Sequence, residues 1–151
     1  MTQASDIVAR ARSYLGTPFA HRGRLPGVGL DCVGVGICVA RDEGLKPRDF
    51  DVPPYLMVPD GVTLLKHCRE HMDQVTQAQM RAGDMIIVRR GHLPQHAGIL
   101  GDYAAAPGAL SIIHSTNEPE YHRVIEQRLM FHNKLRFVAA FRFRGVQKWA
   151  S

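Results

Sequence analysis

The stretch GLDCVGVGICVARDEG, residues 29–44, determines how the rest of the chain can be arranged. It is apolar almost all round from Cys32 onward and ends at Gly44, a pattern typical of a helix buried on every side. Gly34 and Gly36 each weaken such a helix by about 1 kcal/mol, so we expect them to permit close packing against a neighbouring element. The stretch therefore predicts a central buried helix that begins at or next to Cys32.

Two further helices are expected on either side of this one. Residues 5–15 have apolar side chains at helical spacing, with Ser5 as a candidate N-cap and Gly16 at the end. Four prolines in residues 46–61 forbid a long element there. Residues 62–73 fit a short amphipathic helix.

The pattern changes after the Gly83–Asp84 turn to short runs with β-type composition. These runs are MIIVRR (85–90), HAGIL (96–100), LSIIH (110–114), RVIEQRL (123–129) and RFVAAFRF (136–143). Helices followed by strands predict an α+β fold, with N-terminal helices packed on a mostly antiparallel β-sheet of about five strands. A length of 151 residues fits one domain, residues 1–151.

Composition narrows the range of partners. The chain is 45% hydrophobic and 22% charged, as globular proteins are, and no stretch approaches the roughly 20 apolar residues of a membrane span. A net charge of +5 favours anionic partners. Basic residues gather near the C-terminus at Arg136, Arg142, Arg144 and Lys148. Because Arg142 and Arg144 alternate with phenylalanines, we interpret them as a solvated strand face and expect no nucleic-acid partner.

The three cysteines are expected to be free thiols. Cys32, Cys38 and Cys68 form no CxxC pair and are odd in number, which argues for a reducing compartment rather than a disulfide framework. The first 16 residues lack a basic region followed by an apolar run, so we expect no secretory signal and cytoplasmic synthesis.

Cys32 is the cysteine placed to act as a nucleophile. A free thiol has a pKa of about 8.5, and a helix N-terminus stabilises the thiolate by at most about 2 kcal/mol, so a neighbouring imidazolium is needed as well. Cys32 opens the buried helix, where backbone N–H groups can also steady an oxyanion. We therefore expect iodoacetamide to label it well below pH 8.5, and faster than Cys38 or Cys68. The preceding Asp31 is a candidate N-cap or loop holder.

Four motifs follow one another along the chain: GTPF (16–19), GLDCVGV (29–35), AGDMIIV (82–88) and HAGIL (96–100). In this order and spacing they resemble the NlpC-type cell-wall cysteine peptidases. The resemblance covers about residues 6–143 and implies a circularly permuted papain-like fold. The loop PFAHRGR (18–24) is similar to the variants encoded beside the tail genes of phages and gene-transfer agents.

The resemblance also implies roles for individual residues. His96 would be the general base and acid, and His114 would hold the far nitrogen of its ring. Phe19, His21 and Asp31 would contact the substrate. Most of the family has tyrosine where this chain has Phe19, so the oxyanion site beyond the backbone N–H of Cys32 stays open, with His21 either replacing part of it or only shaping the cleft.

Other site types are less favoured. His67 and His71 have the i, i+4 spacing of a helical metal site, but no third ligand is evident and we expect no metal. The segment GVGLDCVGVG (27–36) lacks the GxGxxG pattern after a strand that would indicate a dinucleotide site, and we expect no cofactor.

Three functions remain open at this point. The first is a cysteine peptidase that hydrolyses peptidoglycan stem peptides through an acyl-enzyme on Cys32, by resemblance between D-glutamate and the diamino acid, with delivery by a phage-type tail or by lysis. The second is a related amidase or acyltransferase on other acyl substrates. The third is a catalytically silent tail component, for which Phe19 is the best argument.

Overall fold

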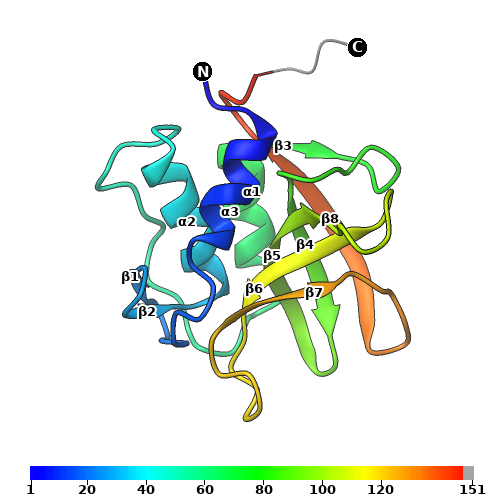
Figure 1. Cartoon of the computed structure of the whole chain (residues 1–151). Helices are drawn as coiled ribbons and strands as arrows, with labels where there is room; N and C mark the ends of the chain where they lie inside the picture. The colour runs from blue at the N-terminus through cyan, green and yellow to red at the C-terminus, as the bar shows by residue number, and fades with distance from the viewer. Residues whose placement is uncertain (148–151) are drawn as a thin grey trace.

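The computed structural model describes residues 1–147, in which three helices cover one face of a six-stranded sheet and a two-stranded sheet lies beside them (Figure 1). The helices are α1 (Ala4–Arg12), α2 (Cys32–Asp42) and α3 (Thr63–His71). The small sheet consists of β1 (Arg24–Leu25) and β2 (Gly29–Leu30). The large sheet has the order β3-β8-β4-β5-β6-β7 with all neighbours antiparallel: β3 (Met72–Val75), β4 (Met85–Arg90), β5 (Leu93–Asp102), β6 (Leu110–Ser115), β7 (Val124–Arg128) and β8 (Leu135–Phe143).

The α+β prediction is therefore confirmed, with one strand more in the main sheet than the five expected. The extra strand is β3, which the sequence had placed at the end of a helix over residues 62–73. The helix ends at His71 because Met72 is buried and the next residues pair with β8. Backbone pairing with a strand 70 residues away leaves no local trace in the sequence.

The first helix is also shorter than expected. It begins one residue earlier than Ser5, with Gln3 as N-cap in a capping box with Asp6, and it ends at Arg12 rather than Leu15. The chain then turns, and the N–H of Gly16 bonds to the carbonyl of Val124 beside β7. Leu15, expected on the buried face, is exposed as a result.

Helix α2 is the central helix that the sequence predicts. Its residues from Gly34 to Ala40 are buried, and the carboxylate of Asp31 accepts a hydrogen bond from the N–H of Gly34 at 2.8 Å, which caps the helix. A Cβ at Gly34 would collide with the backbone carbonyl of Gly23. One at Gly36 would come within 3.1 Å of the terminal methyl of Met85. The two glycines therefore permit the close packing that was expected of them.

Two apolar layers enclose the large sheet. One lies between the sheet and the helices, and includes Val35 and Val39 of α2 with Ile99 and Ile113 of the sheet. The other lies on the opposite face and includes Ile86, Val88, Leu100 and Ile112. Successive residues along a strand thus point into different layers, because side chains in a strand alternate between its two faces.

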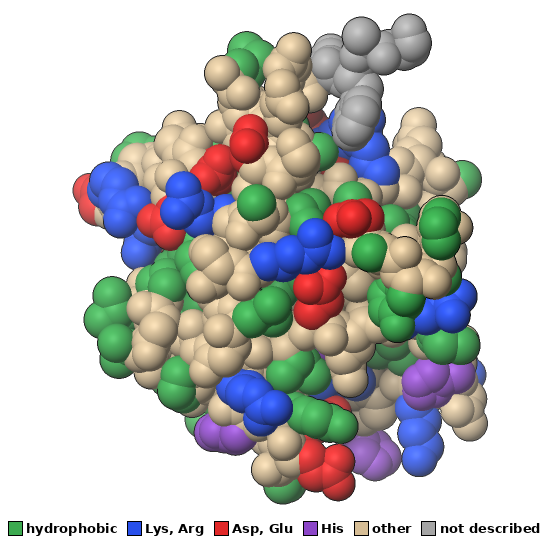
Figure 2. Space-filling model, in the orientation of Figure 1, with side chains coloured by type: hydrophobic (Ala, Val, Ile, Leu, Met, Phe, Trp, Pro, Cys, Tyr) green, Lys and Arg blue, Asp and Glu red, His purple; other side chains and the backbone are tan. Residues whose placement is uncertain are grey.

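The strand-face interpretation of the C-terminal arginines holds in part. Phe141 and Phe143 are buried, but Arg142 forms an ion pair with buried Asp84 at 2.8 Å rather than only facing solvent. Lys148 lies outside the described residues. On the face shown in Figure 2, basic and acidic side chains are interspersed. No helix within residues 1–147 is long and apolar enough to cross a membrane.

The N-terminal half of β5 is paired with β4 but not with β6, and this opening in the sheet accommodates the start of α2. Strand β5 pairs with β4 as far as Leu93, whereas its pairing with β6 stops at Ile99 and Ile113. The backbone of Ala97 is therefore free of β6, and its N–H hydrogen-bonds the sulfur of Cys32. The first turn of α2 is thus placed against the open side of β5.

Candidate active site

A cleft of about 310 Å³ opens at the N-terminus of α2. It is bounded by α2, by the start of β5, by the first turns of α3 and by the proline-rich segment 52–60. Five of the six predicted site residues line it: Phe19, His21, Asp31, Cys32 and His96. The sixth, His114, does not line the cleft and lies behind His96.

The two histidines form a relay across three strands. The Nε2 of His96 on β5 lies 2.7 Å from Nδ1 of His114 on β6. The Nε2 of His114 lies 3.0 Å from the amide oxygen of Gln127 on β7. All three residues are brought together by the β5–β6–β7 register, because they are separated by 18 and 13 residues in the chain.

The relay determines which nitrogen of His96 carries a proton. The amide oxygen of Gln127 can only accept, so Nε2 of His114 donates and its Nδ1, in the neutral ring, accepts. Nε2 of His96 must then be the donor, which leaves Nδ1 of His96 as a lone-pair nitrogen. A neutral His96 in this tautomer is a base.

Burial shifts the pKa values of the thiol and of both imidazoles towards their neutral forms. It raises the pKa of Cys32 to about 11, with a smaller contribution from the neighbouring carboxylate of Asp31, against the hydrogen bond from Ala97 and the charge of Arg90. Burial also lowers the pKa of His96 well below its usual value, followed by the effect of His114. The pKa of His114 falls to about 4, mainly by burial.

Burial therefore opposes the thiolate and imidazolium pair that the sequence led us to expect, and that pair stays a prediction. The helix terminus and a nearby imidazole were expected to favour the thiolate, but the desolvation of the Cys32 sulfur and of the His96 ring was not visible in the sequence. Desolvation disfavours both charged partners at once.

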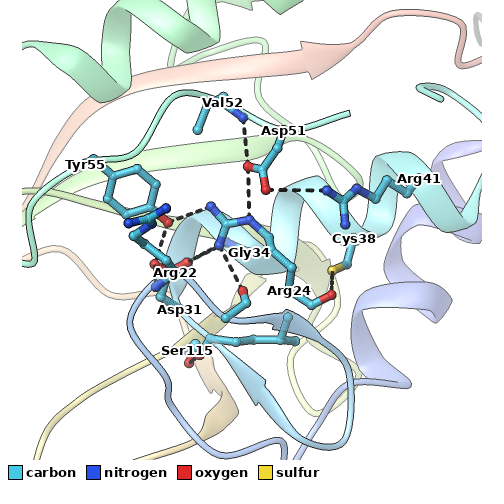
Figure 3. Close-up of polar contacts among 12 residues, drawn as sticks. Arg22, Arg24, Asp31, Gly34, Cys38, Arg41, Asp51, Val52, Tyr55 and Ser115 are labelled. Atoms are coloured by element: carbon cyan, nitrogen blue, oxygen red, sulfur yellow. Dashed lines mark hydrogen bonds and ion pairs between the residues drawn. The ribbon is translucent and has the colours of Figure 1, made fainter. Parts of the chain in front are cut away.

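Asp31 is the centre of a hydrogen-bond network at the base of the cleft (Figure 3). One carboxylate oxygen accepts from the N–H of Gly34 at 2.8 Å and from Arg24 at 3.1 Å. The other accepts from the N–H of Arg22 at 2.8 Å and from the hydroxyl of Tyr55 at 2.5 Å. The N-cap role expected for Asp31 is confirmed. Substrate binding by Asp31 stays a prediction, and both of its oxygens are already engaged.

Phe19 and His21 form the rim beside this network. The ring of Phe19 packs edge-on against His122 with centroids 5.3 Å apart. The ring of His21 packs edge-on against Tyr55 at 5.7 Å. Tyr55 therefore brings a phenol into the cleft, and its hydroxyl is held by Arg24 at 2.7 Å and by Asp31.

Four residues of the site were missed by sequence reasoning. Arg90 lies at the end of β4 on the cleft wall, where its side chain is 15% exposed and pairs with Glu118 at 2.9 Å. Gln95 and Tyr55 also line the cleft, and Gln127 completes the relay. The position of Gln95 next to His96 was the one local signal. The others depend on strand register or on how segment 52–60 folds back.

The histidine pair on α3 has no third metal ligand beside it within residues 1–147. His67 and His71 lie on α3, and the ammonium of Lys46 approaches Nδ1 of His71 at 3.4 Å. Across residues 1–147, no three His, Cys, Asp or Glu side chains converge in a way that could hold a metal ion.

Comparison with known proteins gives a structural match. No protein-family model matches the sequence, and no curated protein does either. The solved crystal structure of the NlpC/p60 domain of the peptidoglycan hydrolase SagA superimposes with a TM-score of 0.52 and 24% sequence identity. The alignment covers 84% of this chain and 90% of that domain. The fold is that of an NlpC/p60 domain. The papain-like architecture expected from the motifs is therefore confirmed.

Proposed function

We propose that this protein is a cysteine hydrolase that cleaves amide bonds in the stem peptides of peptidoglycan. The observation that supports this most directly is the His96–His114–Gln127 relay, which ends in the cleft that Cys32 also lines. The structural similarity to a domain of a peptidoglycan hydrolase supports the choice of substrate.

The proposed reaction starts from the neutral thiol and the neutral imidazole. Nδ1 of His96 takes the proton of Cys32 while the sulfur attacks the amide carbon. Because the free thiol has a raised pKa, proton transfer and attack are coupled rather than successive. The charge that develops on the carbonyl oxygen lies near the N-terminus of α2, where backbone N–H groups stabilise it.

The second half of the cycle returns both groups to their starting state. The imidazolium of His96 protonates the leaving amine, which leaves an acyl thioester on Cys32. A water molecule, deprotonated by His96, then attacks the thioester, so the products are a carboxylic acid, an amine and the free thiol. His114 and Gln127 hold the tautomer of His96 through both steps.

The expected bond joins D-glutamate to the diamino acid, and the expected setting is a phage-type tail or lysis after cytoplasmic synthesis. The bond follows from the overall motif resemblance, and the phage-type setting follows from the PFAHRGR loop at residues 18–24. We propose them as the specific form of the activity.

Purified sacculi test the proposal. Wild type, Cys32→Ala and His96→Ala are incubated with sacculi, and the released fragments are analysed by mass spectrometry. We expect new amine termini from wild type only, with a loss of at least about 1000-fold in both variants, because nucleophile and base act as a unit. Cys68→Ala is the matched control, since Cys68 is a buried thiol on α3 that does not line this cleft.

Two outcomes would contradict this function. Equal fragment release by wild type and Cys32→Ala would exclude Cys32 as the nucleophile. Absence of release by wild type, with the fold intact, would favour the catalytically silent tail component.

A second candidate is hydrolysis or transfer of other acyl groups. It is favoured by the exposed apolar side chains of Leu56, Met57 and Val58, which line the cleft. A panel of N-acyl amino acids with chains of increasing length tests it. Turnover that rises with chain length, with sacculi left intact, would replace the proposed function by this one.

A further inference from the structure

Two buried polar atoms in residues 1–147 have no hydrogen-bond partner, and both belong to side chains that line the Cys32 cleft. They are the amide oxygen of Gln95 and Nδ1 of His67. A buried polar atom without a partner costs about 1–3 kcal/mol, and more than about 90% of such atoms in folded proteins are paired. Two of them at one cleft indicate groups that a ligand satisfies.

The acceptor of Gln95 is held in a defined orientation. The side chain is 3% exposed, and its Nε2 donates to the carbonyl of Gly61 at 2.5 Å. This bond fixes which end of the amide is nitrogen and which is oxygen. Gln95 is one residue before His96 on β5, and it shares its side of the strand with Ala97, which packs in the layer between sheet and helices. Its oxygen therefore lies on the helix side of β5.

His67 lies on the wall opposite the sheet, in the middle of α3. Its ring also borders a second, apolar cavity of about 70 Å³ behind α2, so it separates that cavity from the cleft. The carboxylate of Glu70 is 3.9 Å from Nδ1, which is too far for a hydrogen bond. The side chain of His67 thus lines the same cleft as that of Gln95, and its Nδ1 has no hydrogen-bond partner within residues 1–147.

We propose that Gln95 and His67 form a polar subsite that binds a backbone amide N–H of the substrate, with the amide oxygen of Gln95 as the acceptor. The proposal rests on the proposed function and deepens it, because it assigns the recognition of a peptide chain to residues away from the catalytic relay. Leu64 and Leu93 on the neighbouring walls are apolar and have no side-chain acceptor for an amide N–H, whereas the oxygen of Gln95 is one. A plain acyl chain has no donor for it.

Binding to inactive protein separates this subsite from catalysis. The Cys32→Ala protein is titrated calorimetrically with a soluble stem peptide and with analogues in which each amide nitrogen is methylated in turn. Methylation removes the donor and adds bulk at one place only. We expect one analogue to bind at least about tenfold more weakly than the parent peptide.

A second variant identifies the acceptor. In Cys32→Ala/Gln95→Met, which keeps the side-chain volume, the parent peptide should bind about tenfold more weakly, and methylation at the same nitrogen should add little further loss. His67→Phe in the Cys32→Ala background should give a smaller change in the same direction. Gln77→Met, an exposed glutamine in the turn after β3, is the matched control and should leave all affinities unchanged.

The outcomes are distinguishable from failure of the proposed function. If wild type hydrolyses sacculi but the analogues bind alike, or if the methylation penalty persists in Gln95→Met, the substrate does not donate to the oxygen of Gln95 and the subsite is refuted. If neither binding nor hydrolysis of stem peptides is seen, the proposed function fails, and the subsite fails with it.

Discussion

Cys32 differs from the other two cysteines in exposure more than in acidity. Burial raises the pKa of Cys32 and of Cys38 to about 11 and that of Cys68 to about 12, although Cys32 is only partly buried as a residue and the other two are fully buried. Reactivity towards a small alkylating reagent depends on the thiolate fraction and on access. Access therefore distinguishes Cys32 at the residue scale.

Alkylation kinetics test this difference. With iodoacetamide we expect Cys32 to react first of the three thiols in the native protein, with a rate that rises about tenfold per pH unit and has its midpoint above pH 9. The order is the one expected from the sequence, and the pH at which Cys32 reacts decides between a raised pKa and the labelling well below pH 8.5 expected there. Mass spectrometry of peptides labelled at several pH values gives the three rates. Half-maximal labelling of Cys32 below pH 8 would show that a thiolate pair exists in the free protein.

At the scale of one element, the packing of helix α2 depends on how closely its two glycines approach neighbouring groups. Gly34 lies against the backbone carbonyl of Gly23, which cannot move without shifting the loop that Asp31 holds. Gly36 lies against the flexible end of Met85, which can change rotamer. A side chain at Gly34 would thus meet fixed backbone, whereas one at Gly36 would meet a side chain that can move.

Alanine substitutions at Gly34 and Gly36 distinguish these two steric situations. Gly34→Ala should destabilise the protein by about 2–4 kcal/mol, because a methyl group overlaps a fixed backbone atom. Gly36→Ala should change stability by less than about 1 kcal/mol, since the gain in helix propensity of about 1 kcal/mol offsets the repacking of Met85. Urea unfolding followed by circular dichroism measures both. Equal losses in the two variants would contradict the packing described here.

At the scale of the whole molecule, the free energy of unfolding should depend on acid, because the two buried histidines belong to a relay that joins strands β5, β6 and β7. His96 and His114 have lowered pKa values in the folded state, so below pH 6.5 the unfolded chain binds protons that the folded chain does not. The stability that these rings contribute is fully present above pH 6.5 and is lost as the pH falls. For His114, a pKa of about 4 against 6.5 corresponds to about 3 kcal/mol.

Unfolding free energies measured between pH 7 and pH 4 test this. We expect a steep loss in wild type and a shallower slope in His114→Gln, which removes one of the two titrating rings. His92→Gln, at an exposed site in the β4–β5 turn, should keep the wild-type slope. A slope in His114→Gln as steep as in wild type would show that other groups cause the acid sensitivity.

Prediction from sequence succeeded where the signal was local. The buried character of α2, its start at Cys32, the N-cap at Asp31 and five of the strands all follow from periodicity, capping and turn residues within a few positions. The boundaries of α1 and the strand β3 were wrong because backbone bonds to β7 and β8 decided them. His96 and His114 were predicted from motif order, and their roles remain a prediction.

By itself the sequence determined the fold class and the nucleophile candidate, because both depend on side-chain type at short spacing, whereas the residues of the cleft rim came from the motif resemblance. Only the tertiary structure decided the tautomer of His96, the raised pKa of the thiol, the engagement of Asp31 with Tyr55 and the unpaired atoms of Gln95 and His67. Desolvation and hydrogen-bond geometry depend on which distant segments enclose a group, and no local pattern of residues specifies that enclosure.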